Sequence, residues 1–260
     1  METGCFAGRW KYHLEWIDKG IVLARGTFRE ADMWLRLLFR HHGVQSVFAF
    51  GGQHSRRRFV GCLDLLNELE CSVKSSRTGQ YLELCEASLV QGPGLLRTRR
   101  KELGLCVNCM KLVDSIGVPQ EAAAGVFSLL HDLIQALGEP VEKPLITGLL
   151  FRLRVLDLLG YTPVFSSCLS CRKKRTGGAF FSIEEGGVFC FACAAKRNLN
   201  GARFAGAALD TLESAMQSPP RAWADVDFPQ AELRKVACCV DGMLRYHAGL
   251  AWEKGRYCRI

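Results

Sequence analysis

Two pairs of cysteines constrain this chain more than any other feature, because their spacing is typical of a metal site. Cys168 and Cys171 form the first C-x-x-C pair, Cys190 and Cys193 form the second, and 18 residues separate the pairs. Two residues between cysteines allow a tight turn to direct both sulfur atoms at one ion, and two such turns complete a closed tetrahedral site. Four thiolates leave no open coordination position, so the pattern predicts one structural Zn²⁺ ion. The alternative is a set of four reduced cysteines without a metal.

The segment between the two pairs predicts a short hairpin. An apolar pair at 180–181 comes before a Glu-Glu-Gly-Gly turn at 184–187, and a second apolar pair at 188–189 leads directly into Cys190. This order is typical of a zinc ribbon. The basic run 172–175 after the first cysteine pair has two interpretations: a contact for nucleic acid, or a solvated loop that balances the thiolate charge.

The total of 13 cysteines is interpreted through the redox compartment. Charged residues interrupt residues 1–19, so no secretory signal is expected there. The most apolar stretch, 145–159, is broken by Arg152, Arg154 and Asp157, whereas a membrane span needs about 20 apolar residues. We therefore expect a cytoplasmic protein with reduced thiols, in which the nine cysteines outside the two pairs are small apolar side chains.

The first third of the chain predicts β-structure. Short apolar or alternating runs are separated by Gly-rich turns, and five of them are strand candidates: Ile17–Phe28, Trp34–Phe39, Val44–Phe50, Phe59–Val73 and Tyr81–Val90. The beginning of the fourth candidate would also suit a helix. Five short strands in about 75 residues predict a small closed or partly closed barrel.

Helical periodicity begins after the Gly/Pro-rich segment 91–94. Apolar residues recur at helical spacing over five segments: Leu96–Ile116, Pro119–Leu137, Leu145–Leu159, Ala205–Met216 and Gln230–Gly249. The cysteine module lies between the third and fourth of these segments. The fold class is therefore predicted as α+β, with a barrel followed by an all-α domain that contains an inserted zinc ribbon.

The distribution of charge suggests a polyanionic partner. The formal net charge is +8, of which +4 lies within residues 166–198. Candidate nucleic-acid contacts lie in two loops of the predicted barrel: Arg56, Arg57 and Arg58 in the first, and Lys74 and Arg77 in the second. Basic loops beside strands form a groove for a phosphate backbone. Four aromatic residues could stack bases there or belong to the core: Phe48, Phe50, Phe59 and Tyr81.

No catalytic constellation is recognisable in the sequence. Motifs for phosphate-binding loops, dinucleotide binding, zinc proteases and serine hydrolases are absent. Cys106 and Cys109 form a third C-x-x-C pair, but the pair lies in a helical pattern without the βα context of a thioredoxin-type site. We therefore expect no enzyme, and a thiol redox enzyme that uses Cys106 and Cys109 is the weaker alternative.

The order of these features resembles the bacterial recombination mediator RecO. The resemblance rests on Gly20–Leu23 followed by Glu30–Asp32, the basic loop after the third strand, and the Gly92-Pro93 boundary. The most specific element is the run Leu159-Gly160-Tyr161-Thr162-Pro163, directly ahead of the first cysteine pair. The resemblance covers about residues 17–250.

This resemblance implies an N-terminal OB-fold and the four-cysteine zinc ribbon, with Zn²⁺ held by Cys168, Cys171, Cys190 and Cys193. It further implies a nucleoid-associated protein of DNA repair that binds single- and double-stranded DNA and anneals complementary strands. The implied partners are RecR, the C-terminal tail of single-stranded-DNA-binding protein, and RecA, which RecO and RecR help to load onto coated single strands.

Five segments are expected along the chain: an N-terminal extension (1–16), the OB-fold domain (17–92), the first part of the helical domain (93–165), the zinc-ribbon insertion (166–198), and the second helical part with a C-terminal tail (199–260). A different class of function stays open beside DNA binding, namely a protein-interaction adaptor whose ribbon and helices dock partners.

Overall fold

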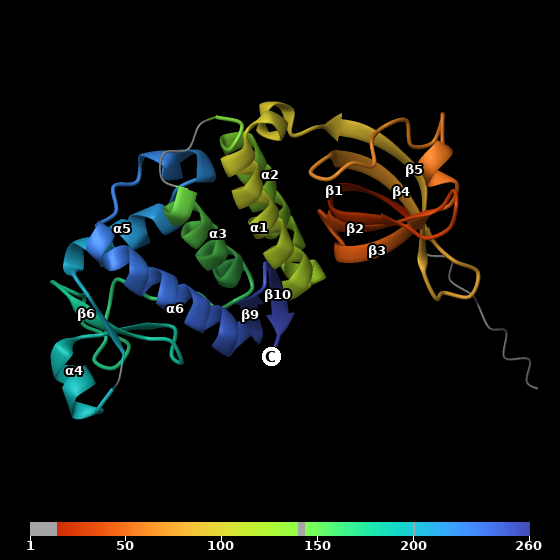
Figure 1. Cartoon of the computed structure of the whole chain (residues 1–260). Helices are drawn as coiled ribbons and strands as arrows, with labels where there is room; N and C mark the ends of the chain where they lie inside the picture. The colour runs from red at the N-terminus through yellow and green to blue at the C-terminus, as the bar shows by residue number, and fades with distance from the viewer. Residues whose placement is uncertain (1–14, 140–143, 200) are drawn as a thin grey trace, which may run out of the picture. The chain divides into compact units, whose positions relative to one another are not determined.

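The computed structural model describes residues 15–139, 144–199 and 201–260. They divide into two compact units (Figure 1). Among the described residues, the first unit comprises those up to Leu37 together with Gln45–Gln91, and the second comprises Leu38–Val44 together with those from Gly92 onward. The predicted extension, 1–16, lies outside the described residues except for its last two, which belong to the first strand. Within the described ranges, no helix combines the length and the apolar character needed to cross a membrane.

Five strands form a closed barrel in the order β1-β2-β3-β5-β4. Their bounds are β1 Glu15–Thr27, β2 Met33–Phe39, β3 Gly43–Ala49, β4 Glu68–Ser75 and β5 Leu82–Gln91. β1 pairs antiparallel with β4, and β3 pairs with β5 in a short parallel ladder, Val47 with Leu82 and Phe48 with Glu83. Side chains alternate across the barrel wall, so Val47 and Ala49 are buried inside while Phe48 is directed outward.

The strand predicted over 59–73 is wrong in its first half. Residues up to Asn67 form turns, after a 3-10 helix, η1 (Gly52–His54), and the strand begins only at Glu68. Phe59, Leu63 and Leu66 are nevertheless buried, because this loop packs its apolar side chains against the barrel. The side-chain amide of Asn67 donates to the backbone carbonyl of Cys62, with Nδ2 and the oxygen 2.7 Å apart. The apolar residues that suggested a strand over 59–67 therefore belong to a loop that packs on the barrel.

All five predicted helices of the second unit are present, with ends within four residues of the predicted bounds. Their bounds are α1 Arg100–Ile116, α2 Gln120–Ala136, α3 Pro144–Leu158, α5 Gly206–Gln217 and α6 Gln230–Ala248, with the 3-10 helices η2 (Gly94–Thr98) and η3 (Pro220–Asp225). α3 contacts α1, α2, α5 and α6. Gly148 of α3 permits a close approach to α1, since a Cβ there would lie 2.9 Å from Leu105.

The predicted hairpin is confirmed as the antiparallel pair of β6 (Ala179–Ser182) and β7 (Gly187–Phe189), and a third strand, β8 (Ala202–Phe204), extends it to a three-stranded sheet. β6 lies between β7 and β8, and the short helix α4 (Phe191–Lys196) connects the last two. β8 lies beyond the predicted end of the ribbon at 198. The β6–β7 turn is held by α6, where His247 Nε2 lies 2.7 Å from the Ile183 carbonyl and Gly242 leaves room for the Ile183 side chain.

The predicted C-terminal tail is a second hairpin, formed by β9 (Leu250–Glu253) and β10 (Arg256–Arg259). Lys254 and Gly255 both have positive φ angles, 47° and 81°, as the tightest hairpin turns require. Trp252 and Tyr257 pack edge to face across the hairpin, with ring centroids 4.8 Å apart. The hairpin therefore adds an aromatic face to the second unit.

Candidate metal centre and nucleic-acid interface

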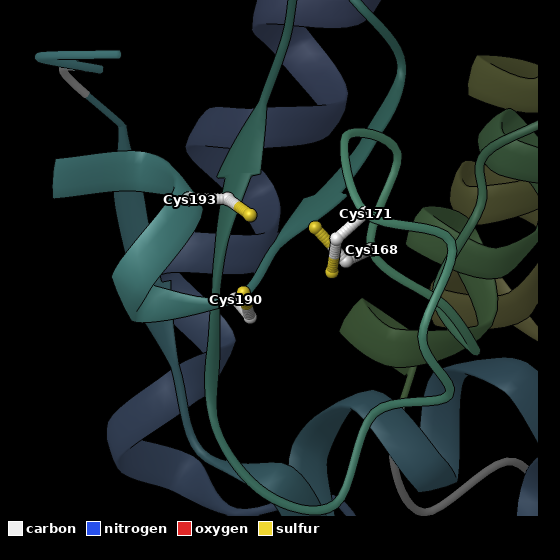
Figure 2. A group of neighbouring side chains, drawn as sticks. All are labelled: Cys168, Cys171, Cys190 and Cys193. Carbon is white, nitrogen blue, oxygen red and sulfur yellow. The ribbon is translucent and has the colours of Figure 1, made fainter. Parts of the chain in front are cut away.

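The two cysteine pairs converge from opposite ends of the ribbon. Cys168 and Cys171 lie in the loop ahead of β6, Cys190 immediately precedes α4, and Cys193 lies in the first turn of α4. Figure 2 shows the four side chains turned toward a common point, and their sulfur atoms all lie within 4.8 Å of one another. The chain thus gathers the four residues that the spacing predicted would act together.

Backbone hydrogen bonds hold the first pair in a tight turn. The Cys168 carbonyl accepts from the Arg172 amide at 2.9 Å, and the Cys168 amide donates to the Lys173 carbonyl at 3.0 Å. Burial opposes ionisation of the Cys168 thiol, but backbone N–H groups of Cys171, Cys190 and Ser170 bind its sulfur and lower its pKa to about 6. The turn therefore stabilises negative charge on a sulfur atom, as a metal-binding thiolate requires.

These cysteines fit a single zinc ion. Zn–S bonds of about 2.3 Å in a tetrahedron place the sulfur atoms about 3.8 Å apart, so only small movements from the observed arrangement are needed. The donor set is four sulfurs, which suits Zn²⁺ and disfavours the oxygen-seeking ions Mg²⁺ and Ca²⁺.

Arg175 belongs to the architecture of the ribbon and not to its surface charge. Its guanidinium donates to the carbonyls of Phe165 (2.9 Å), Gly177 (2.8 Å) and Gly206 (3.3 Å), and it also pairs with the Asp210 carboxylate. Its side chain is only 7% exposed. Of the basic run 172–175, the first three residues alone are exposed.

An aromatic cluster covers one outer side of the barrel. Phe48 contacts three rings, with centroid distances of 5.3 Å to Phe28, 6.5 Å to Phe50 and 5.6 Å to Tyr81. Phe28 is 50% exposed and Tyr81 39% exposed, whereas Phe59 is buried and therefore cannot stack a base. Three of the four aromatic residues predicted as candidates thus meet on one surface.

The cluster brings two loops together. Phe28 directly follows β1 and begins the β1–β2 turn, and Tyr81 ends the β4–β5 loop. The Gly51 amide donates to Asp32 Oδ1 at 2.8 Å, which ties the β1–β2 turn to the segment after β3. The sequence interpretation missed Phe28 and Arg29, whose guanidinium lies 5.1 Å from the Phe28 ring centroid. In the sequence, an aromatic residue followed by arginine at the end of a predicted strand could have indicated these two residues as nucleic-acid contacts.

The predicted basic contacts differ in their surroundings. Arg56, Arg57 and Arg77 are exposed and form no ion pair with any residue that the structure describes. Arg58 donates to the Phe50 carbonyl and lies over the Phe59 ring. Lys74 is part of β4 rather than of the following loop, and its ammonium pairs with Glu83 at 3.4 Å. The cations that contact the aromatic cluster are thus Arg29, through the Phe28 ring, and Arg58, through the Phe50 carbonyl.

The third C-x-x-C pair lies within α1 and points inward. Cys106 is fully buried and Cys109 is 3% exposed. Burial raises the pKa of Cys106 to about 12, and burial together with the neighbouring Cys106 raises that of Cys109 well above its ordinary value. A nucleophilic or redox thiol requires the opposite shift. The structure thus favours a packing role for both cysteines.

Comparisons with known proteins give the family. The family model described as "Recombination protein O N terminal" matches residues 13–93, and "Recombination protein O C terminal" matches residues 97–256. The chain belongs to the RecO family. The two matches meet between β5 and α1, at the same Gly/Pro-rich segment where the character of the sequence changes.

Curated relatives are similar over nearly the whole chain. "DNA repair protein RecO" of Lawsonia intracellularis is 37% identical over 254 residues, which is 95% of this chain and 100% of the relative. The proteins of the same name from Nitratidesulfovibrio vulgaris and Solidesulfovibrio magneticus are 36% and 38% identical, each over 95% of this chain and 100% of the relative.

The buried pair in this RecO-family chain leads to a reactivity prediction. At pH 8, Cys106 and Cys109 should react with iodoacetamide at least tenfold more slowly than the exposed Cys238, because their thiols are inaccessible and remain protonated. Mass spectrometry of tryptic peptides after timed alkylation measures the three rates. Alkylation of Cys106 or Cys109 as fast as that of Cys238 would instead support thiol chemistry in α1.

Proposed function

We propose that this chain is a non-enzymatic DNA-binding mediator of recombinational DNA repair, and that its barrel is an OB-fold. The observation that carries the proposal is the aromatic cluster between two loops of a five-stranded barrel. In OB-folds, the face of strands 2 and 3 and the loops β1–β2 and β4–β5 bind oligonucleotides. Phe48, Phe28 and Tyr81 occupy these three places, and the RecO-family membership supports DNA as the ligand.

The chemistry of strand annealing needs no catalytic acid or base. It needs neutralisation of phosphate charge, so that two strands can approach, and a surface that holds bases unstacked from one another but free to pair. Aromatic rings bind the π-face of a base and leave its pairing edge accessible. The exposed guanidinium groups of Arg56, Arg57 and Arg77 would bind phosphates of single- or double-stranded DNA and release counterions.

The barrel proposal predicts two separable defects in DNA binding. Changing Phe48 and Tyr81 to Ala should weaken binding of a single-stranded oligonucleotide about 5- to 150-fold for each lost stacked base, since such stacking is worth about 1–3 kcal/mol. Changing Arg56, Arg57 and Arg77 to Ala should lower the slope of log affinity against log salt by about 0.7 for each lost phosphate contact. Fluorescence anisotropy over a salt series measures both.

Matched controls exist in the second unit. Tyr246→Ala removes another exposed aromatic ring, and Arg221→Ala with Arg234→Ala removes two exposed cations. These controls should leave affinity and salt slope unchanged. If the barrel variants behave like the controls, the barrel is not the DNA-binding surface.

Zinc is the metal we propose for the four-cysteine cluster. The purified chain should contain about one zinc per molecule, and Cys193→Ser should lower that content, whereas Cys238→Ser outside the cluster should not. Affinity should fall as the pH is lowered, because protons compete with the metal for the thiolates. Chelation should make residues 166–204 sensitive to protease while the barrel stays folded. A metal-free chain with a protease-resistant ribbon would contradict the proposal.

RecR, RecA in its loading, and the acidic C-terminal tail of single-stranded-DNA-binding protein are the partners we propose, and membership of the RecO family supports them. For the tail, a specific surface supports the proposal. A cavity of about 510 Å³ is bordered by α1, α3, α6 and the β9–β10 hairpin. Its lining includes the cation Lys101, the ion pair of Arg152 with Asp241, and four large apolar or aromatic side chains: Leu105, Leu145, Trp252 and Tyr257. An acidic peptide with apolar residues combines the two chemistries that this cavity offers.

Binding of the tail can be tested directly. Lys101→Ala and Trp252→Ala should each weaken binding of a synthetic tail peptide about tenfold, or about 1.4 kcal/mol, because the proposal makes these two residues the charged and the aromatic anchor of the site. Leu95→Ala, at an exposed apolar residue outside the cavity, is the control. Equal affinity of the three variants, measured by calorimetry, would assign the tail to another surface.

A cytoplasmic, nucleoid-associated location is proposed on the same grounds as the function.

A protein-interaction adaptor is the alternative function. The cavity beside Trp252 favours it in part, because peptide docking there requires no DNA. Peptide binding by a chain that has no affinity for DNA at physiological salt would make the adaptor the primary function.

A further inference from the structure

The ribbon carries a cavity that the metal site does not account for. Its volume is about 410 Å³, far more than one ion requires. Besides Cys168, Cys171 and Cys190, its lining consists of the loop 173–178, the start of β6, Val188 of β7, and Phe191 at the beginning of α4. The cavity thus lies next to the cysteine cluster and extends beyond it over the basic loop.

The charge around this cavity is positive. None of the residues that line it is a carboxylate, and Lys173 and Lys174 are both exposed. Across residues 166–204 there are seven Lys and Arg against two Glu. Two of these cations are paired, Arg175 with Asp210 and Arg197 with Glu185. The other five are exposed. Their combined charge of +5 is more than is needed to balance the charge of −2 that four thiolates and one Zn²⁺ carry. The lysines are therefore more than a counterbalance for the metal site.

An exposed aromatic ring lies beside these cations. Phe191 is 49% exposed and meets Phe180 edge to face, with centroids 5.7 Å apart. Arg203 lies 4.8 Å from the centroid of Phe180. The backbone of Gly178 lies against Phe191, because a Cβ at Gly178 would come within 3.4 Å of the ring. The ring is therefore held at the surface by its neighbours, with one part open to a ligand.

We propose that this ribbon cavity binds a second segment of single-stranded DNA, with phosphates at Lys173 and Lys174 and a base stacked on Phe191. Ammonium groups next to an exposed ring match the alternation of phosphate and base along a single strand. A double helix hides the faces of its bases, and an acidic peptide has no base to stack, so both match the ring less well. The inference concerns a different surface from the barrel, and it holds whether or not the barrel binds DNA.

The test uses the full-length, zinc-loaded chain and two probes of equal length, a thymidine oligonucleotide and an abasic phosphodiester. In a chain that also carries Phe48→Ala and Tyr81→Ala, Phe191→Leu should weaken binding of the oligonucleotide about 5- to 150-fold and leave the abasic probe unchanged. Lys173→Ala with Lys174→Ala should weaken both probes and lower the salt slope by about 1.4. Zinc content and circular dichroism establish that each variant is folded.

Lys196→Ala is the matched control, because this exposed lysine belongs to the ribbon but does not line the cavity. A loss equal to that of the Lys173 and Lys174 variant would overturn the proposal in favour of general attraction. Unchanged oligonucleotide binding by the Phe191 variant would also overturn it. A third outcome would overturn it as well: a poly-glutamate peptide binds saturably, and the Lys173 and Lys174 changes abolish that binding but leave DNA binding intact. Because barrel variants in an otherwise natural chain report separately on the proposed function, the two claims can fail independently.

Discussion

The parallel pairing of β3 with β5 is the constraint on which the barrel surface depends. This ladder is short, Val47 with Leu82 and Phe48 with Glu83, yet it places Tyr81 beside Phe48. Successive side chains of a β-strand point to opposite faces, so burial of Val47 and Ala49 inside the small barrel directs Phe48 to the outside. A slip of one residue would exchange these faces and remove the aromatic cluster. The candidate interface is thus a consequence of how the barrel closes.

The second unit uses a different device to present side chains. α3 is buried along most of its length, and its neighbours include α1, α5 and α6. The ribbon is fixed to this framework through Arg175, which joins the first cysteine turn to α5, and through Ile183, which packs on α6. Both the barrel and the ribbon therefore offer exposed aromatic rings beside unpaired cations, although entirely different local structures hold them in place.

The sequence predicted the elements whose pattern is long or chemically specific. The helices followed from apolar periodicity, and the gathering of the four cysteines followed from a spacing that is typical of metal sites. The segment from Phe59 to Asn67 was misinterpreted, because a loop that packs on a barrel has buried residues without strand geometry. β8 and the C-terminal hairpin escaped notice, since the first has three residues and the second turns at Lys254-Gly255, outside the common Asn-Gly pattern. Lys74 was assigned to a loop because strand ends are poorly defined by sequence, and its ion pair with Glu83 depends on cross-strand register.

Photo-crosslinking of single-stranded DNA to the intact chain, followed by mass spectrometry of the crosslinked peptides, tests the central claim most directly. Ultraviolet crosslinks form where bases stack on aromatic side chains, so the method reports the contact that the account requires. We expect crosslinks at Phe28, Phe48 or Tyr81 on the barrel, and at Phe191 on the ribbon. Crosslinks confined to other parts of the chain, with these peptides unmodified, would contradict the account.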